Sequence, residues 1–313
     1  MTLLCKKLLE DYENTKPKSI PQKLIFKGIS NKDVYNTTAP FMDHGALIIA
    51  GRVESRSNEI SQVMFFEKYN NVWCHAADSP ILNMQDPFVT RINDDLIVGG
   101  VETFANPDDN KIYSWRTIMY KGKDIFHLKL FFIGPDGMKD LRIAKLKNNQ
   151  IGVFVRPQGA KGGRGKIGFA KIDNIDDLSV GLLNRAPLLK NFFDDSEWGG
   201  VNAAYPLTNN LVGILGHIAC HDENKNVHYY SIAFVLNTDT LEYSNVKIVA
   251  KRKNFLPGES KRPDLEDVVF SGGLEFKDKK AVLYAGVSDA DAQTLEVDNP
   301  FYDFMQNSKE GSF

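Results

Sequence analysis

The carboxylate best placed for chemistry is Asp86, which stands at the start of a short apolar run in the string Gln-Asp-Pro-Phe at 85–88. Pro87 fixes the backbone next to it, so the start of the strand is rigid. A turn of Asn and two Asp at 93–95 precedes a second apolar run, 96–101, which predicts an antiparallel hairpin. A rigid carboxylate at a channel mouth suits general-acid catalysis on a sugar, but a turn Asp that caps backbone amides is the more common case.

Four polar residues of an earlier stretch are candidates for contacts with a substrate: Asp33, Asn36, Arg52 and Glu54. Arg52 and Glu54 are two positions apart on a predicted strand, so their side chains point to the same face. Such a pair either lines a polar channel that binds hydroxyl groups or forms an ion pair that faces solvent. The sequence leaves both interpretations open.

Residues 156–169 form the most unusual stretch, a glycine-rich run with two arginines and two lysines between predicted strands. Glycine lets backbone amides approach an anion, and the guanidinium groups of Arg156 and Arg164 offer forked donors to phosphate oxygens. Lys166 adds a third cation near them. The run is not a Walker sequence and lacks a strand–helix context, so a solvated hairpin loop is the alternative interpretation.

Three histidines, His217, His221 and His228, lie close together in the sequence, and Tyr229 and Tyr230 follow them. Their mixed spacing on predicted strands, without a clear carboxylate partner, does not indicate zinc, and we expect no metal site. His217 with a tyrosine hydroxyl could bind phosphate or a sugar hydroxyl. A half-buried, hydrogen-bonded histidine is the alternative.

The composition excludes several classes of function. The 313 residues have 42% hydrophobic and 25% charged side chains and a formal net charge of −2, so we expect no nucleic-acid partner. Cys5, Cys74 and Cys220 lack framework spacing, which predicts reduced thiols and a cytoplasmic location. No apolar run is long enough to cross a membrane, and we expect neither a membrane partner nor a signal peptide.

The elements that must position these residues are mostly short strands. Residues 1–22 read as an N-terminal arm with a short amphipathic helix over 3–14, and residues 23–313 as one all-β domain. A turn followed by an apolar strand recurs five times, which predicts a five-bladed β-propeller whose first strands line a central channel. A β-sandwich is the alternative. The anchors of the five copies are Leu47, Leu96, Ile151, Leu211 and Val282.

Several strings together resemble one family, the dual-activity β-1,2-mannosyltransferase/phosphorylases, whose fold is similar to the five-bladed propellers of inverting β-mannoside phosphorylases. The resemblance spans roughly residues 30 to 300. Two residues depart from the pattern of those phosphorylases: Gln85 stands where they usually have Glu, and Phe88 stands where they usually have Arg. The strings that carry the resemblance are Asp-Val-Tyr-Asn-x-Thr-Ala-Pro-Phe at 33–41, Gln-Asp-Pro-Phe at 85–88, Arg-Pro-Gln-Gly at 156–159, Gly-Gly-Arg-Gly-Lys-Ile-Gly at 162–168, Trp-Gly-Gly-Val-Asn at 198–202 and Gly-His-Ile at 216–218.

The resemblance implies inverting phosphorolysis or synthesis of β-1,2-linked mannosides, with a β-mannoside oligosaccharide and inorganic phosphate or mannose 1-phosphate as partners and no cofactor. Asp86 is then the general acid. Phosphate would be bound by the cations and rings at Arg156, Arg164, Lys166, His217, Tyr229 and Tyr230. The mannoside would be bound by Asp33, Asn36, Arg52, Glu54, Asn202 and Asp267.

Two other functions remain compatible with the same propeller. A glycoside hydrolase would need a second carboxylate as a base, for which Asp33 and Asp267 are the candidates. A non-catalytic propeller that binds carbohydrate would need neither. Because phosphate is already a nucleophile, a phosphorylase needs only one protein carboxylate, and the basic loop favours that reading over hydrolysis.

Overall fold

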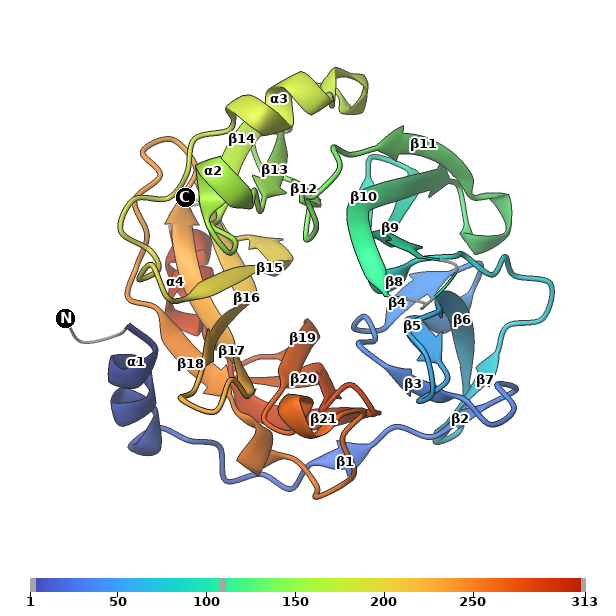
Figure 1. Ribbon diagram of the computed structural model, residues 1–313. Helices are drawn as coiled ribbons and strands as arrows, with labels where there is room; N and C mark the ends of the chain where they lie inside the picture. The colour runs from blue at the N-terminus through green and yellow to red at the C-terminus, as the bar shows by residue number, and fades with distance from the viewer. Residues whose placement is uncertain (1–3, 107, 109–110, 311–313) are drawn as a thin grey trace.

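The computed structural model describes residues 4–106, 108 and 111–310, and within them five sheets surround a central axis (Figure 1). The predicted all-β fold and five-bladed propeller are therefore confirmed. The short N-terminal helix is confirmed as well, as α1 (Leu4–Glu13). None of the helices in the described ranges combines the length and the apolar composition needed to cross a membrane.

Each blade is one sheet, and its strands follow one another outward from the axis (Figure 1). Blade 1 contains β3 (Asp33–Tyr35), β4 (Phe41–Asp43), β5 (Ala46–Glu54), β6 (Ser61–Tyr69), β7 (Val72–His75) and β2 (Phe26–Lys27). Blade 2 contains β8 (Gln85–Ile92), β9 (Asp95–Ala105), β10 (Ile112–Gly122) and β11 (Lys129–Ile133). Blade 3 contains β12 (Arg142–Lys145), β13 (Ile151–Val155) and β14 (Gly168–Ile172). Blade 4 contains β15 (Trp198–Pro206), β16 (Leu211–His221), β17 (Val227–Asn237) and β18 (Lys247–Ala250), and blade 5 contains β19 (Val269–Lys277), β20 (Lys280–Val287), β21 (Asp291–Asp298) and β1 (Gln22–Lys23).

The remaining elements are short helices in the connections and at the C-terminal end. The α-helices are α2 (Gly159–Gly162), α3 (Val180–Arg185) and α4 (Tyr302–Glu310), and the 3-10 helices are η1 (Ile125–His127), η2 (Ile175–Asp177), η3 (Arg252–Asn254) and η4 (Pro263–Leu265).

The five repeat anchors all fall on the second strand of a blade, counted outward from the axis along the sheet. These strands are β5, β9, β13, β16 and β20. The hairpin predicted around Asp86 is also present, since β8 and β9 pair antiparallel. The repeat predicts five similar blades of four strands, which is wrong for blade 3, with three strands, and for blade 1, with six. After β14, Ser179 caps α3 by accepting a hydrogen bond from the amide of Leu182, and the buried Leu183 of that helix joins the core of blades 2 and 3. Helical turns thus take the place of the outer strand.

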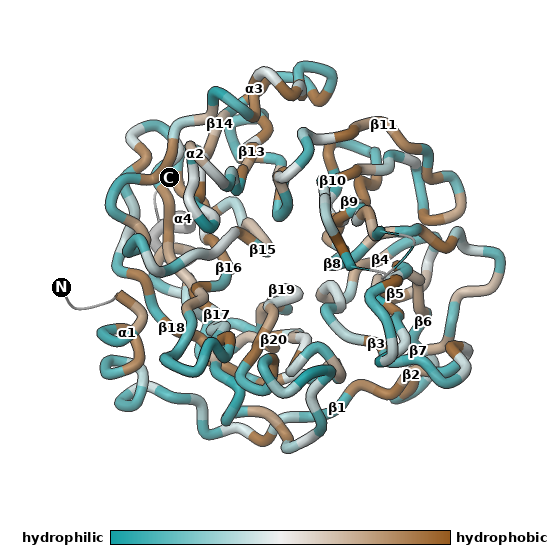
Figure 2. Tube along the Cα trace, in the orientation of Figure 1, coloured by the Kyte–Doolittle hydropathy of each residue, from teal (hydrophilic) through white to brown (hydrophobic). Residues whose placement is uncertain are grey.

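Buried hydrophobic side chains fill the spaces between neighbouring blades. Ile97 of blade 2 belongs to the same cluster as Val153 of blade 3, and Leu215 of blade 4 shares a cluster with Leu283 of blade 5. Figure 2 shows hydrophobic residues along the strands and hydrophilic residues in many connecting loops. The blades therefore hold one another in place, and residues at the inner strands are fixed relative to each other.

The N-terminal segment closes the ring. β1 pairs antiparallel with β21 of blade 5, and β2 pairs parallel with β7 of blade 1. The predicted boundary after residue 22 falls inside β1. Before it, α1 lies against blade 4, where the amide of Cys5 donates to Glu197 Oε1 at 2.7 Å and its Sγ lies 3.8 Å from Cys220 Sγ.

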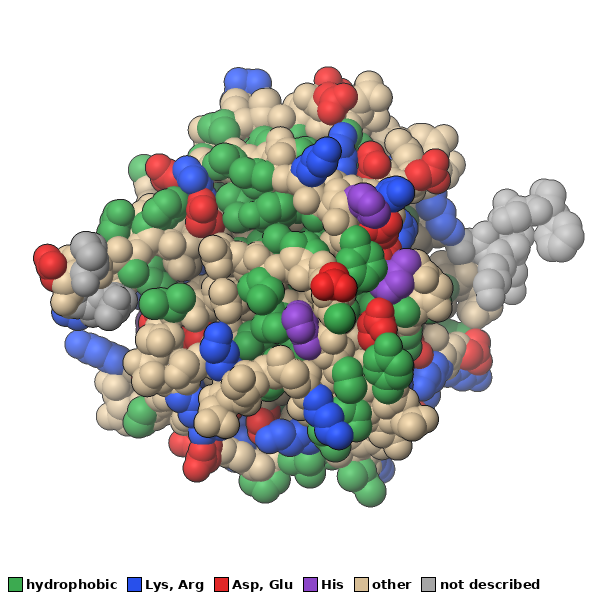
Figure 3. Space-filling model, turned by 90° about the vertical axis from the view of Figure 1, so that its right-hand side faces the viewer, with side chains coloured by type: hydrophobic (Ala, Val, Ile, Leu, Met, Phe, Trp, Pro, Cys, Tyr) green, Lys and Arg blue, Asp and Glu red, His purple; other side chains and the backbone are tan. Residues whose placement is uncertain are grey.

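The outer side of blades 1 and 2 mixes hydrophobic and charged side chains, as Figure 3 shows. The exposed hydrophobic residues of these two blades lie at their edges and turns, among them Met42, Tyr69, Phe126 and Leu130. Single exposed apolar side chains of this kind are normal for a folded protein. The polar groups considered below lie instead at the inner strands.

Candidate active site

A cavity of about 210 Å³ lies on the propeller axis and is lined by the inner strands or their flanking residues in all five blades. Phe88, Arg142 and Asn202 reach it from blades 2, 3 and 4, and residues 38–41 and 272–274 line it from blades 1 and 5. A site on the axis is therefore assembled from distant parts of the chain, as the propeller prediction requires.

The inner strands of blades 1 to 3 share a backbone feature near the axis. Asn36, Asp86 and Asp140 have φ angles of 46°, 50° and 58°, in the left-handed region that Asn and Asp tolerate better than most residues. At Asp86 this backbone coincides with a β-bulge, because the pairing of β8 with β9 shifts between Gln85 and Phe88. Bulges redirect side chains and are common beside active sites. The side chains of these three polar residues therefore do not follow the regular alternation of side chains along their strands.

Asp86 is held from one side by two donors of blade 1. Asn36 Nδ2 donates to Asp86 Oδ1 at 2.8 Å, and Arg52 Nη1 donates to the same oxygen at 3.2 Å. Among the described residues no protein group donates to Asp86 Oδ2. The side chain is 14% exposed, so this second oxygen remains available to a ligand.

Arg52 is itself fixed by a buried network. Its Nε and Nη2 donate to Glu54 Oε2 at 2.8 and 2.6 Å, and Nε also donates to Ser61 Oγ at 2.9 Å. Arg52 is 5% exposed and Glu54 is 1% exposed, so the solvent-facing ion pair considered from the sequence is wrong. Asp33, in contrast, pairs at the rim with Arg56 Nε at 2.6 Å.

A second group of charges lies on blades 3 and 4. Arg156 is buried, and its three nitrogens donate to Gly199 O at 3.0 Å, to Asp140 Oδ2 at 3.1 Å and to Arg164 O at 3.3 Å. Gly165 must be glycine here, because its φ is 141° and a Cβ would lie 2.4 Å from Arg156 Nε. Arg156 therefore anchors the glycine-rich loop while Asp140 balances its charge.

The loop presents its other cations differently. The guanidinium of Arg164 lies 4.2 Å above the Trp198 ring, and within the described ranges this guanidinium makes no hydrogen bond to protein. Its donors are therefore free for an anion. Lys166 Nζ lies 3.5 Å from Asp195 Oδ1, and this pair is exposed, whereas Arg156 is buried.

His217 connects the loop group to the axis. Its Nδ1 is 2.9 Å from Asn202 Oδ1, and its Nε2 is 3.8 Å from Asp140 Oδ2. Burial lowers the pKa of His217 to about 3 against the pull of Asp140, and the nearby cations add to the lowering, so the ring is neutral at neutral pH. The Nδ2 group of Asn202 is buried and has no hydrogen-bond partner in the part of the chain that the structure describes. Asn202 lines the axial cavity, so this amide can donate to a ligand.

The two predicted tyrosines separate because successive side chains of a strand point to opposite faces. Tyr229 stacks on His217 with ring centroids 5.2 Å apart, and its hydroxyl accepts from Trp198 Nε1 at 2.9 Å. Tyr230 points to the other face of β17, where its hydroxyl donates to Asp267 Oδ2 at 3.1 Å. Asp267 also bonds His228 Nδ1 at 2.7 Å. The structure therefore brings Tyr229 to His217 and places Tyr230 and Asp267 in a separate group.

Three residues that the sequence interpretation missed belong to this site. Asp140 lies just before the first strand of blade 3, and Asp86 lies at the start of the first strand of blade 2. This shared position in the repeat is the sequence signal that could have identified Asp140. Arg142, two positions later, donates to Asn202 O at 3.1 Å and lies 4.7 Å above the Phe88 ring. Burial lowers the pKa of Arg142, while the carboxylates of Asp140 and Asp86 raise it, so this cation lies within electrostatic reach of both charge groups.

The third missed residue is Asp289, in the turn after β20. Burial raises the pKa of Asp289, Arg52 opposes this, and the charge of Asp86 adds to the increase. It is thus a second carboxylate that interacts with Asp86. Nothing in its local sequence distinguishes it from an ordinary turn Asp, because its neighbours come from blades 1 and 2.

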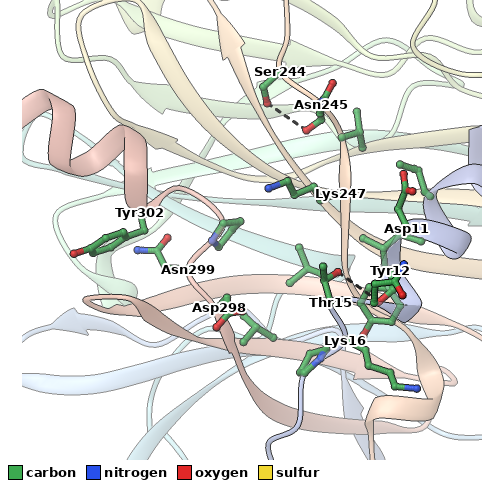
Figure 4. Close-up of a pocket in the computed structure, with 18 of the residues that line it drawn as sticks. Asp11, Tyr12, Thr15, Lys16, Ser244, Asn245, Lys247, Asp298, Asn299 and Tyr302 are labelled. Carbon is green, nitrogen blue, oxygen red and sulfur yellow. Dashed lines mark hydrogen bonds between the residues drawn. The ribbon is translucent and has the colours of Figure 1, made fainter.

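A much larger pocket, of about 1120 Å³, lies outside the ring and is unrelated to these groups. Figure 4 shows its polar lining, from Asp11, Tyr12 and Lys16 of the N-terminal arm to Lys247 of β18 and Tyr302 of α4. None of the site residues predicted from the sequence lines it. Volume alone therefore does not identify the site, and the convergent charges on the axis do. Among the described residues, no set of three or more His, Cys, Asp or Glu side chains is arranged to hold a metal ion.

The buried His217 predicts an acid-sensitive fold. In the unfolded chain an imidazole takes up a proton below about pH 6.5, whereas the folded ring stays neutral down to about pH 3. The unfolded state therefore binds more protons between these values, and the free energy of unfolding falls as the pH falls through this window. Urea unfolding from about pH 4 to 7 should show a smaller slope against pH for His217→Gln than for wild type. Equal slopes would contradict the buried neutral ring.

Comparison with known proteins gives a consistent result. A family described as "Protein of unknown function (DUF1861)" matches residues 10–303. MPT-4, a mannose phosphorylase from Leishmania mexicana solved with phosphate ion, is 32% identical, with a TM-score of 0.87 over 96% of this chain and 94% of that one. MPT-1, a GDP-Man-dependent mannosyltransferase from the same organism, is 30% identical, with a TM-score of 0.85 over 95% of this chain and 94% of that one.

A more distant structure shares the fold alone. The β-1,2-mannobiose phosphorylase from Listeria innocua is 14% identical, with a TM-score of 0.61 over 90% of this chain and 94% of that one. No curated protein sequence matches this chain.

Proposed function

This chain belongs to the DUF1861 family, and we propose that it is a glycosyltransferase or glycoside phosphorylase that cleaves or builds β-1,2-linked mannosides with inversion, using inorganic phosphate or mannose 1-phosphate. The observation that carries the proposal is the Asp86 carboxyl on the first strand of blade 2: none of the described residues donates to its Oδ2, and Arg142 lines the axial cavity near it. The activities of the two Leishmania relatives support the same reaction class.

In the proposed mechanism, Asp86 gives its proton to the glycosidic oxygen, directly or through a sugar hydroxyl, as the bond from that oxygen to the anomeric carbon breaks. A phosphate oxygen forms a bond to the same carbon from the opposite face, which yields α-mannose 1-phosphate and a shortened mannoside. Phosphate brings negative charge to the channel, and this charge favours the protonated form of a nearby carboxyl. No second carboxylate is needed, because the nucleophile is already an anion.

The residues proposed to bind phosphate differ in their freedom to do so. Arg164 offers a guanidinium that has no acceptor among the residues that the structure describes, and Asn202 offers a buried amide N–H. Arg156 contributes charge and holds the loop, since its nitrogens already bond to protein. Neutral His217 donates from Nδ1 to Asn202 Oδ1, so it orients the Asn202 amide without adding charge. Preorganised donors of this kind stabilise the charge that develops during the transfer.

On the sugar side, Asn36 and Arg52 position Asp86, and Glu54 acts through Arg52. Asp33 at the rim and Asp267 in its group with Tyr230 are proposed as outer contacts of a longer mannoside. A cytoplasmic location belongs to the same proposal, and three free cysteines without framework spacing support it.

A hydrolase remains the second candidate because Asp289 interacts with Asp86. Asp33 and Asp267, the bases considered from the sequence, are engaged with Arg56 and with His228. Asp289 has no such partner among the hydrogen bonds of the described residues, so it is the better candidate for a base that activates water.

One assay separates these functions. The protein is incubated with β-1,2-mannobiose with and without inorganic phosphate, and mannose and mannose 1-phosphate are measured. We expect mannose 1-phosphate only when phosphate is present. Equal release of mannose in both reactions would favour the hydrolase, and binding without turnover would favour a carbohydrate-binding propeller.

A further inference from the structure

The loop between blades 4 and 5 carries a lysine whose side chain crosses to blade 1. Lys261 lies between η3 and η4, and its amide is anchored by a 3.0 Å hydrogen bond to Ser288 O. Its side chain is 3% exposed, and its Nζ contacts Glu54 Oε1 and lies 2.9 Å from Glu59 Oε2. A lysine this buried is unusual unless it is paired. The loop is therefore held over the junction of blades 5 and 1 by buried charge.

The contacts of Lys261 continue to Asp86. Glu54 receives Lys261 on Oε1 and Arg52 on Oε2, so one carboxylate orients both cations. Arg52 in turn donates to Asp86 Oδ1. The four side chains form a series of alternating charge that begins on a loop and ends at the proposed general acid. Glu54 is 1% exposed, so it would keep no solvent partner for Oε1 if the lysine were removed.

We propose that Lys261 is a positioning residue for the reaction at Asp86: it fixes Glu54, which fixes Arg52, which orients the Asp86 carboxyl. It touches neither sugar nor phosphate and acts through its neighbours. The expected effect of Lys261 on turnover rests on the proposed function. Its expected effect on the position of Arg52 rests only on the contacts described above.

Because Lys261 can lose its proton, its role predicts how kcat depends on pH. Burial, with the charges of Arg52 and Arg262, lowers the pKa of Lys261 to about 8, and Asp289 and Asp33 oppose this change. Glu54 and Glu59 also face the ammonium group, and Arg262 shares Glu59 at 2.9 Å. Above this pH the neutral amine no longer balances Glu54. We therefore expect an alkaline decline of kcat near pH 8 that belongs to a residue outside the substrate channel.

The test compares two substitutions in the full chain with β-1,2-mannobiose and phosphate as substrates. Lys261→Met removes the charge but keeps an unbranched side chain one atom shorter, and we expect kcat to fall by about tenfold to a hundredfold with little change in KM for phosphate. Lys261→Arg keeps the charge at every assayed pH, so it should restore most of kcat and move the alkaline decline to higher pH. Lys280→Met is the matched control, because Lys280 is 53% exposed and pairs with Asp298 away from the axis.

Each outcome is decisive. An unchanged kcat for Lys261→Met, or an alkaline decline that Lys261→Arg leaves in place, would overturn the proposal. If Lys261→Met does not fold, the pH profile of Lys261→Arg still decides. If the wild type turns over no mannoside, the proposed function has failed, and a crystal structure of Lys261→Met then tests the geometry. The proposal requires the Arg52 Nη1 to Asp86 Oδ1 distance to lengthen beyond its present 3.2 Å.

Discussion

Asp86→Asn should abolish turnover, with kcat lower by about a hundredfold to ten-thousandfold, while the melting temperature stays nearly unchanged. The amide cannot supply the proton that the leaving oxygen needs. It can still accept the hydrogen bonds that Asn36 and Arg52 donate to Oδ1. Asn also tolerates the φ of 50° at this position as well as Asp does, so the substitution adds no backbone strain. The measurement is kcat for phosphorolysis beside a thermal unfolding curve.

A matched control separates the loss of the acid from the general effect of replacing an Asp that has a left-handed backbone conformation. Asp278 has a φ of 55° in the exposed turn between β19 and β20, and none of the site residues contacts its side chain. Asp278→Asn should keep both kcat and the melting temperature of the wild type. Activity retained by Asp86→Asn would remove Asp86 from the mechanism, whatever the control shows.

Arg156→Gln should lower the free energy of unfolding by about 3–5 kcal/mol, because it leaves Asp140 buried without its main cation. Asp140 is 3% exposed, and the charge of Arg156 helps to keep its pKa low, at about 2, despite burial. The substitution also removes the donors to Gly199 O and Arg164 O, which hold the glycine-rich loop. Urea unfolding near neutral pH measures the loss.

Two further variants identify the cause of that loss. Arg156→Gln/Asp140→Asn removes both charges of the buried Arg156–Asp140 pair, so the double variant should lose less stability than the single one. Lys166→Gln, in the same loop, should change the free energy of unfolding by less than about 0.5 kcal/mol, because the partner of Lys166 is 99% exposed. A double variant only as stable as Arg156→Gln would show that the loop contacts, and not the unpaired carboxylate, dominate.

The fold could be predicted from the sequence because its signals are local. Each second strand follows a turn and has an apolar pattern, and all five anchors fall on such strands. The sequence did not indicate that blade 3 lacks a fourth strand. Ser179 caps a helix, α3, where the repeat suggested another strand. Short apolar runs do not distinguish the two choices by periodicity alone.

The site was only partly predictable because it is assembled across blades. Asp86, Arg52 and Asn36 carried local signals, and the structure brings them together. Asp289 and Lys261 reach the same network from blade 5 and from a loop, and no spacing along the chain indicates that they meet Arg52. Tyr229 and Tyr230 were both predicted to bind phosphate, but they alternate along β17, and only the packed ring decides that Tyr229 faces His217.

The strand pairing that closes the ring has a consequence for biosynthesis. β1 precedes all five blades in the chain, whereas its partner β21 follows four of them, so the last sheet cannot be completed until β21 has been translated. A product that stops before β21 would leave β20 as a bare edge, which is a template for aggregation. Nascent-chain truncation therefore yields aggregation-prone fragments rather than smaller working enzymes.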